Sequence, residues 1–225
     1  FHGFAVAASV PDRRQFSRVL RTLAHAMLDW VLSATITLHK DALSPDQQVT
    51  FGDVVTGDTQ AILAWVRENN PKEWITNRFD STQQPRGDAD CKVGIKRRRN
   101  TTPEATPPTP TTEPVPAATL QVGVDIFWGY ATGIVTTALP DGTEIVLAER
   151  TRPFNESDIS HFFPLMAQVE QRLGRRPPTG VWDTAFDAQY VYDYYHEAGG
   201  QAIVPFNGHG KPGARRQFDA DGRPL

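Results

Sequence analysis

The stretch from Gly180 to Asp187, GVWDTAFD, constrains the fold more than any other part of the chain. Two apolar residues lead into Asp183, and a second acid, Asp187, follows four residues later. Beyond Asp187, apolar residues recur at helical spacing as far as Gly199-Gly200. The pattern predicts a short strand that ends on a carboxylate and turns into a helix. A carboxylate in that place needs acidic partners elsewhere in the chain if it is to hold a metal ion.

The composition is that of a globular protein without a global bias toward nucleic acid. A chain of 225 residues can bury one substantial core, or a small domain beside a larger one. With 39% hydrophobic residues and a net charge of −3, any DNA affinity must come from local basic patches. The single cysteine, Cys91, excludes an internal disulfide and fits a reducing, intracellular setting. No apolar run approaches the roughly 20 residues of a membrane helix. Because the sequence starts at Phe1 and stops in a polar stretch at Leu225, we expect an internal fragment.

Residues 1–46 are expected to form an N-terminal helical region. An amphipathic helix is predicted from Asp12, as its N-cap, with an apolar face that reaches Leu32. Four arginines crowd its first two turns: Arg13, Arg14, Arg18 and Arg21. Their simplest interpretation is the solvated basic face of a packing helix, with direct DNA contact as the alternative.

Residues 47–66 are rich in β-branched side chains and are predicted to be strand-like. Asp58 stands in the middle of this stretch, between Val54-Val55 and Ile62-Leu63. Aspartate is depleted inside strands, so its presence needs a reason. Either Asp58 is a functional acid on one continuous strand, or Gly57-Asp58 is a hairpin turn between two short strands.

Residues 69–118 form a basic, proline-rich insert. Its first part is polar and turn-rich, and Asp88, Asp90 and Cys91 within it lack the further cysteines or histidines of a zinc site. The candidate DNA-binding cluster is Lys92, Lys96, Arg97, Arg98 and Arg99. Such a cluster can neutralise phosphates, and a solvated charge run is the alternative. The last part, 101–118, is rich in proline and threonine and is expected to be an extended, disordered connector.

The second half of the chain predicts an antiparallel hairpin followed by alternating helix and strand. Strands are expected at 120–139 and 143–150, and a helix capped by Ser157 should end at Gly174. Pro164 should kink this helix or move its start to a later residue. The opening strand, its helix to residue 198 and a strand over 201–206 complete an α/β pattern with a mixed sheet.

This order of elements brings two acids together. A helix between the third and fourth strands allows a right-handed crossover that sets the fourth strand parallel to the first and beside it. Asp58 and Asp183 would then lie on adjacent strands, about 5 Å apart in the hydrogen-bonding direction. Carboxylates at that separation can bridge metal ions that lie about 3.5–4 Å apart in phosphoryl-transfer sites. Asp125, the rival to Asp58, should lie one strand further from Asp183. Asp187 is interpreted as the N-cap of its helix.

Several segments resemble the DDE transposases of bacterial insertion sequences. They are GDTQAILAWVRENNPK, RGDADCKVGIKRRRN, FWGYATGIV, LAERTRPFN, FFPLMAQVEQRLG and WDTAFDAQYVYDYYHEAGG, which together span nearly the whole chain. The WDTAFD block, followed by a helix and a strand that ends at Pro205, is the most specific of them. The resemblance implies an RNase H-like α/β fold over residues 47–225, with the insert 69–118 inside it and the C-terminal helix missing.

The same resemblance implies a function and its cofactors. Asp58 and Asp183 would be the first two acids of the catalytic triad and would bind two Mg²⁺ ions, with Mn²⁺ as a substitute. The third acid of this family is a glutamate on a later helix, whereas Glu170 and Glu197 both precede the last strand. We therefore expect weak metal binding and little activity from this chain.

The implied partners are transposon ends and target DNA, and the implied setting is the bacterial cytoplasm, at the nucleoid when the protein is on DNA. A homo-oligomer on DNA and no membrane are also expected. Two alternatives stay open. One is an RNase H-like nuclease that cleaves without strand transfer, and the other is a non-catalytic DNA-binding remnant.

Overall fold

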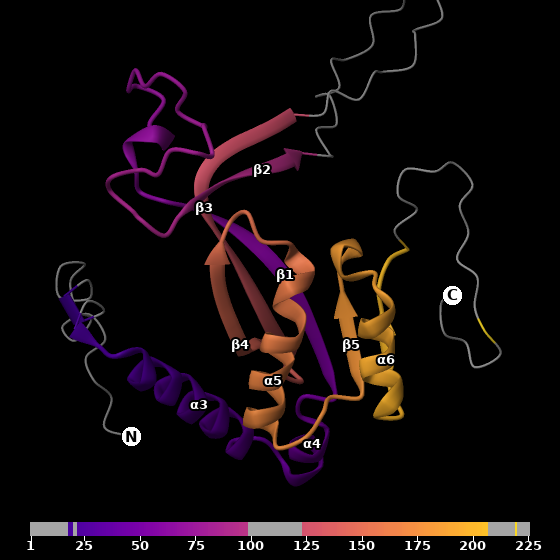
Figure 1. Cartoon of the computed structure of the whole chain (residues 1–225). Helices are drawn as coiled ribbons and strands as arrows, with labels where there is room; N and C mark the ends of the chain where they lie inside the picture. Colours follow the sequence, from indigo (N-terminus) through magenta and orange to yellow (C-terminus); the bar gives the residue numbers. More distant parts are fainter. Residues whose placement is uncertain (1–17, 20–21, 99–122, 207–218, 220–225) are drawn as a thin grey trace, which may run out of the picture.

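The computed structural model describes residues 18–19, 22–98, 123–206 and 219 (Figure 1). Its centre is a six-stranded mixed sheet in the order β2-β3-β1-β5-β6, with β4 also paired to β3. The strands are β1 Val54–Leu63, β2 Lys92–Arg98, β3 Gly123–Ala138, β4 Glu144–Pro153, β5 Thr179–Trp182 and β6 Gln201–Ile203. Strand β3 runs antiparallel to β1, β2 and β4, whereas β1, β5 and β6 are mutually parallel. This arrangement confirms the predicted fold class, an RNase H-like α/β fold with a mixed sheet.

Two helices pack on one face of the sheet, and their apolar side chains form the main core (Figure 1). They are α5 Phe162–Leu173 and α6 Gln189–Glu197. Phe162 and Trp182 meet edge to face, with ring centroids 5.0 Å apart. The face of β1 that meets this core carries Val55 and Gly57, whereas Val54, Thr56 and Asp58 are exposed. This alternation is the period of two expected for a strand with one covered face.

Helix α5 begins later than its first candidate cap, as Pro164 suggested. A 3₁₀ turn, η2 Asp158–His161, precedes it, and Ser157 caps that turn and not the helix. At the other end Gly174 adopts φ of 73°, and its N–H donates to the carbonyl of Glu170 at 2.8 Å. A left-handed residue after a helix favours glycine, so the predicted C-terminus is confirmed.

The prediction of a strand from residue 47 is wrong at its start. Residues Pro45–Thr50 form a short helix, α4, and β1 begins only at Val54. Ser44 and Gln47 form a reciprocal capping box, and Pro45 occupies the first turn, where its missing N–H costs nothing. These local signals outweigh the β-branched Val49 and Thr50. The hairpin alternative is also wrong, because β1 is continuous through Gly57-Asp58.

The basic run was expected in a turn-rich insert, but most of it is a strand. Lys92–Arg98 forms β2, which pairs with the first half of β3 from Lys92↔Gly129 to Arg98↔Gly123. The second half of β3 pairs with β4 as the predicted hairpin. The connector 101–118 lies outside the described residues.

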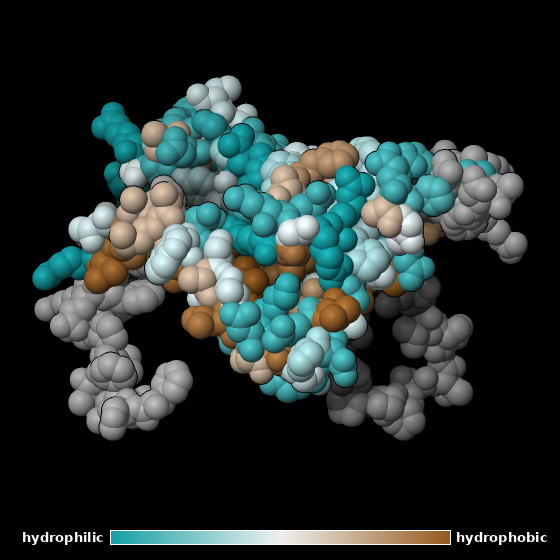
Figure 2. All heavy atoms as spheres, turned by 90° about the horizontal axis from the view of Figure 1, so that it is seen from below, coloured by the Kyte–Doolittle hydropathy of each residue, from teal (hydrophilic) through white to brown (hydrophobic). Residues whose placement is uncertain are grey.

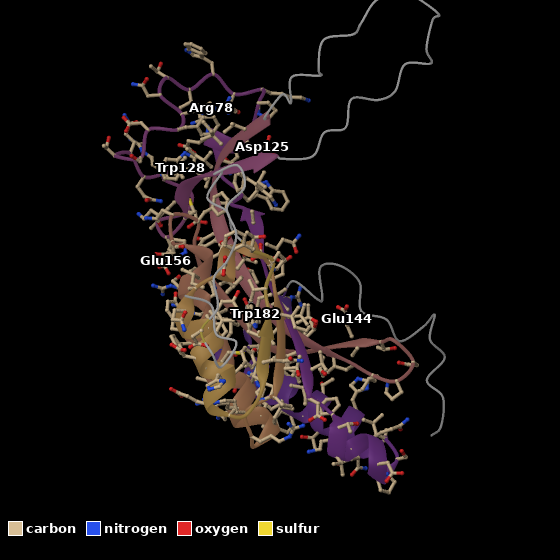
Figure 3. All side chains as sticks on the ribbon, turned by 90° about the vertical axis from the view of Figure 1, so that its right-hand side faces the viewer. Arg78, Asp125, Trp128, Glu144, Glu156 and Trp182 are labelled. Atoms are coloured by element: carbon tan, nitrogen blue, oxygen red, sulfur yellow. The ribbon has the colours of Figure 1, made fainter. Side chains whose placement is uncertain are left out.

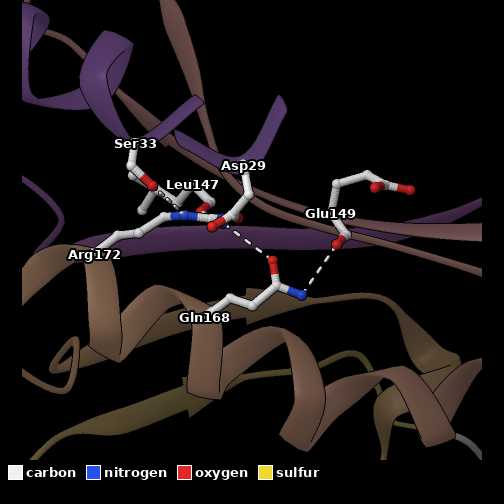
Figure 4. Close-up of polar contacts among 6 residues, drawn as sticks. All are labelled: Asp29, Ser33, Leu147, Glu149, Gln168 and Arg172. Carbon is white, nitrogen blue, oxygen red and sulfur yellow. Dashed lines mark hydrogen bonds and ion pairs between the residues drawn. The ribbon is translucent and has the colours of Figure 1, made fainter. Parts of the chain in front are cut away.

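Helix α3, His25–Asp41, is joined to the sheet domain through Arg172 of α5 (Figure 4). The Arg172 side chain is 7% exposed and forms an ion pair with Asp29 of α3. Its guanidinium also donates to Gln168 Oε1 at 3.1 Å, to Ser33 Oγ at 3.4 Å and to the carbonyl of Leu147. The prediction of one continuous helix from Asp12 to Leu32 is wrong, because Ala24 is extended and is the N-cap of α3, while Asp12 itself lies outside the described residues.

The underside of the molecule, where α3 and α4 lie, shows separate hydrophobic spots among hydrophilic atoms (Figure 2). Met27, Val31 and Leu38 of α3 are among the exposed apolar side chains. None of the helices in the described ranges has the length and apolarity needed to cross a membrane.

Candidate active site

The pairing of β1 with β5 places Asp58 beside Asp183. The last pair in this parallel ladder is Gly57↔Trp182, and the two acids directly follow these paired residues. Adjacent strands lie about 4.8 Å apart, so the two carboxylates leave neighbouring points of the sheet. The adjacency predicted from the order of elements is confirmed.

A glycine and a tryptophan fix the strands just before the two acids. A Cβ added to Gly57 would lie 2.1 Å from Cζ3 of Trp182, so the indole ring occupies the space that a side chain would need. Trp182 is buried, and its Nε1–H donates to the hydroxyl of Tyr195 at 3.0 Å. Its ring also lies 4.6 Å from that of Phe186. Trp182 is therefore a core residue beside the site, and it holds the end of β5 against β1.

Asp58 points away from the covered face of β1 and is exposed. Its Oδ1 accepts a hydrogen bond from the N–H of Thr59 at 2.7 Å. Among the described residues, none donates a hydrogen bond to the other carboxylate oxygen of Asp58. The carboxylate can therefore reach solvent and a ligand at the open face of the sheet.

Asp183 combines a local structural role with unfavourable electrostatics. It caps the 3₁₀ turn η3 Thr184–Phe186, where its Oδ1 accepts from the N–H of Ala185 at 3.0 Å. Loss of hydration against this turn raises the pKa of the Asp183 carboxyl. The negative charges of Asp58 and Asp158 raise the pKa further, whereas the hydrogen bond from Ala185 lowers it. A divalent cation between these carboxylates would relieve the repulsion, so the oxygen donors fit Mg²⁺ or Mn²⁺.

Asp158 is the acid that the sequence interpretation missed. It is the first residue of η2, directly before α5, and it is partly buried. Its neighbour Glu156 lies 2.8 Å from Arg152 in an ion pair, so that carboxylate already has a counter-charge. A Ser-Asp pair before a helix reads as a capping signal, so its sequence context gave no sign of proximity to Asp183.

A pocket of about 370 Å³ opens beside these residues. Its lining includes Thr59 and Gln60 of β1, Glu156 and Asp158 before α5, and Lys96 of β2. Lys96 is thus the member of the predicted DNA-binding cluster that shares a pocket with Glu156 and Asp158, whereas Asp58 and Asp183 are not part of its lining. Lys92 instead donates to Gln84 Oε1 at 2.6 Å.

The remaining basic residues are placed only in part. Arg97 and Arg98 belong to β2, with their backbones paired to β3. Arg99 lies outside the described residues.

The structure keeps the rival first acid away from the pair. Asp125 pairs with Lys96 in the β2–β3 ladder, on the part of β3 that extends beyond β1. In Figure 3 it lies toward the end of the molecule that holds Trp128, at a distance from Trp182.

The role predicted for Asp187 is wrong. Ala188 is the N-cap of α6, because the chain first completes η3 and continues extended through that residue. Asp187 instead accepts from the hydroxyl of Tyr192 at 2.9 Å.

Neither helical glutamate completes a triad. Glu170 accepts from the hydroxyl of Tyr194 at 2.6 Å and lies 3.4 Å from Arg176, which also approaches Glu197 at 3.5 Å. Across the described part of the chain, no group of three His, Cys, Asp or Glu side chains is arranged to hold a metal ion. The strand register therefore brings together two carboxylates, those of Asp58 and Asp183.

Comparison with known proteins leaves the function to the chain's own residues. No protein-family model matches the sequence. No curated protein matches it either. Among solved structures, one match is described as "Mos1 transposase paired-end complex with left transposon end". The TM-score is 0.30 at 13% identity, over 80% of this chain and 43% of that one. This chain thus spans less than half the length of the protein that it is compared with.

Proposed function

We propose that this chain carries part of a metal-dependent phosphoryl-transfer site that acts on DNA, as in a DDE-type transposase. The observation that carries the proposal is the parallel pairing that sets Asp58 beside Asp183 at the end of β5. The raised pKa of Asp183, caused by burial and by its acidic neighbours, is consistent with a site that is incomplete without a cation. The segment resemblance to insertion-sequence transposases supports the same chemistry.

The two acids would act together. Asp58, exposed on the open face of β1, and Asp183, at the end of β5, would hold the ions. When bound, the ions would supply activation of a water or a 3′-hydroxyl and stabilisation of the leaving oxygen. Lys96, at the rim of the adjacent pocket, would contact a DNA phosphate. The register of β1 and β5 would keep both carboxylates on one side of the phosphate.

A test that needs no turnover is the coupling between metal and DNA binding. If a DNA phosphate completes the coordination of an ion, DNA should raise the affinity of the protein for Mn²⁺ by at least about fivefold, and Mn²⁺ should raise the affinity for DNA by the same factor. We expect this coupling in titrations of Mn²⁺, followed by water proton relaxation, with and without a DNA duplex. Asp58→Asn and Asp183→Asn should each abolish it, and Asp125→Asn should retain it. Equal Mn²⁺ affinity with and without DNA in the unchanged chain would refute the proposal.

A non-catalytic DNA-binding protein is the second candidate. It is favoured by the capping role of Asp183 and by the pair of acids, in place of three, within the described residues. In that case DNA would bind, Mn²⁺ would not change its affinity, and the two Asn variants would bind DNA like the unchanged chain.

A further inference from the structure

The connection between β1 and β2, residues 64–91, forms a lobe at one end of the sheet (Figure 1). We refer to these residues as the Trp lobe. The lobe has a small core of its own, made of Ala64, Val66, Cys91 and Trp128 of β3. The Nε1–H of Trp128 donates to the carbonyl of Arg78 at 2.6 Å, and the two residues lie together in Figure 3. The lobe is therefore a built structure that is anchored to β3.

The side chain of Asn69 fastens the lobe to β3 at a second point. Its Nδ2 donates to the carbonyls of Ala64 at 2.9 Å and Trp128 at 2.6 Å. Its Oδ1 accepts from the N–H of Trp128 at 2.8 Å. These bonds satisfy backbone groups where β1 ends, so the residues after Leu63 hold a fixed position.

Two tryptophans of the lobe are directed into solvent. Trp65 is 95% exposed and Trp74 is 87% exposed, whereas Trp128 and Trp182 are almost fully buried. Large aromatic side chains are normally highly buried, and their exposure on an anchored segment marks a binding surface. Packing within the lobe does not explain why a tryptophan stands at each of these exposed positions.

Both tryptophans line one pocket of about 510 Å³ together with arginines. The charged residues in its lining are Arg67, Arg78, Arg86 and Glu68. Because Arg67 forms an ion pair with Glu73 at 3.1 Å, Arg78 and Arg86 supply the positive charge of the pocket. Arg78 is held in place by hydrogen bonds to the carbonyls of Glu68 at 2.8 Å and Asn70 at 2.6 Å. The pocket therefore combines flat apolar faces with a positive rim.

We propose that the Trp lobe binds unpaired nucleotides, with bases stacked on Trp65 and Trp74 and phosphates beside the arginines. Exposed aromatic faces combined with arginines are the features that bind single strands without a sequence requirement. A duplex hides its base faces in the stack, so the tryptophans select bases that are out of the helix. This inference rests on the proposed function, because it assumes that the substrate is DNA.

The position of the lobe agrees with that assignment. Strand β1 runs from Asp58 to Leu63 and leads directly into the lobe, a distance of roughly 17 Å along an extended strand. The lobe continues into β2, whose Lys96 lines the pocket that also holds Glu156 and Asp158. A single strand bound at the lobe would therefore lie within the length of β1 from Asp58.

The test is the binding of fluorescein-labelled 20-nucleotide oligonucleotides, single-stranded or as a duplex, measured by fluorescence anisotropy at low salt. Replacing both tryptophans (Trp65→Ala with Trp74→Ala) should weaken single-strand binding at least about tenfold. Duplex binding should change less than about threefold. The double replacement by Phe should retain most of the single-strand affinity, since a phenyl ring still stacks.

A matched control is Trp30→Ala, because Trp30 is 68% exposed but lies on α3, outside the lobe. It should bind both oligonucleotides like the unchanged chain. Equal loss of single-strand and duplex binding in the double Ala variant, or no loss, would overturn the inference. A change of sedimentation in that variant without DNA would also overturn it, since the surface would then join copies of the chain.

The two proposals fail separately. The coupling of Mn²⁺ to duplex binding depends on Asp58 and Asp183, and it should persist in the double Ala variant. If that coupling persists while single-strand binding is unchanged, the lobe inference alone is wrong. If the unchanged chain binds neither oligonucleotide, both proposals are wrong.

Discussion

Gly57→Ala tests whether the close contact between β1 and Trp182 positions the two acids. The added Cβ would lie 2.1 Å from Cζ3 and 2.5 Å from Cε3 of Trp182, which is far inside van der Waals contact. The indole cannot simply turn away, because Nε1–H is bonded to Tyr195 and the ring is packed against Phe162 and Phe186. The variant must therefore move β5 or distort β1.

The expected cost follows from two opposing terms. Overpacking of a close-packed core costs about 1–3 kcal/mol. Replacing a glycine by alanine in a strand returns about 0.4–1 kcal/mol, because the unfolded chain loses freedom. We expect a net loss of about 1–2 kcal/mol in the free energy of unfolding, measured by urea denaturation. Because the contact lies one residue before each acid, the Mn²⁺–DNA coupling should weaken as well.

A double-mutant cycle separates the contact from other effects. Trp182→Leu destabilises the protein by itself, but it also removes the ring that the new methyl group strikes. Gly57→Ala should therefore cost about 1 kcal/mol less in the Trp182→Leu background than in the unchanged chain. Gly87→Ala is the control, since its Cβ would meet only Val66 at 3.8 Å. Additive effects of the two changes at Gly57 and Trp182 would refute the reasoning.

Three further predictions concern charged and titratable side chains. Arg172→Met should lower the free energy of unfolding by about 2 kcal/mol, because the carbonyl of Leu147 loses its buried donor. Amide hydrogen exchange in α3 should become faster, because the ion pair with Asp29 is lost. An unchanged urea midpoint would contradict this prediction. Asp183→Asn should raise the urea midpoint at pH 7, since burial raises the pKa of Asp183 and its charged form opposes folding. That gain should shrink as the pH falls through the raised pKa of Asp183 and vanish well below 3.8, where the carboxyl is neutral in both the folded and the unfolded chain. A gain that is independent of pH would point to another cause. Burial lowers the pKa of His161, and its ring nitrogens have no hydrogen-bond partner in the described part of the chain. The unchanged protein should therefore lose stability as the pH falls below 6.5. This loss should be smaller in His161→Leu, and parallel pH profiles of the two proteins would contradict the prediction.

The sequence predicted the strand neighbours of the site because local patterns there agree with the final fold. The apolar run into Asp183, the helix that ends at Gly174 and the helix before Gly199 are each defined by nearby residues. Together with the handedness of crossovers, they are sufficient to place Asp183 beside Asp58.

Two of the errors occurred where distant residues decide the structure. Lys92–Arg98 has the composition of a charged loop, and it becomes a strand only because the long β3 offers it a ladder. The proximity of Asp158 to Asp183 comes from the packing of η2 near η3, which no local pattern reveals. The cap assigned to Asp187 missed by one residue, because the 3₁₀ turn after Asp183 uses part of the chain that was assigned to the helix.

Strand β3 is a continuous strand that connects the two proposed binding regions. Its first half pairs with β2 next to the Trp lobe, and its second half pairs with β1 and β4 around Asp58. The distance between the lobe and the acids is thus set by the number of β3 residues between them. Inserting one residue into β3 would turn every following side chain to the opposite face of the sheet. A DNA strand held at both places would have to span this distance, so the number of β3 residues between them would set which nucleotide reaches the carboxylates.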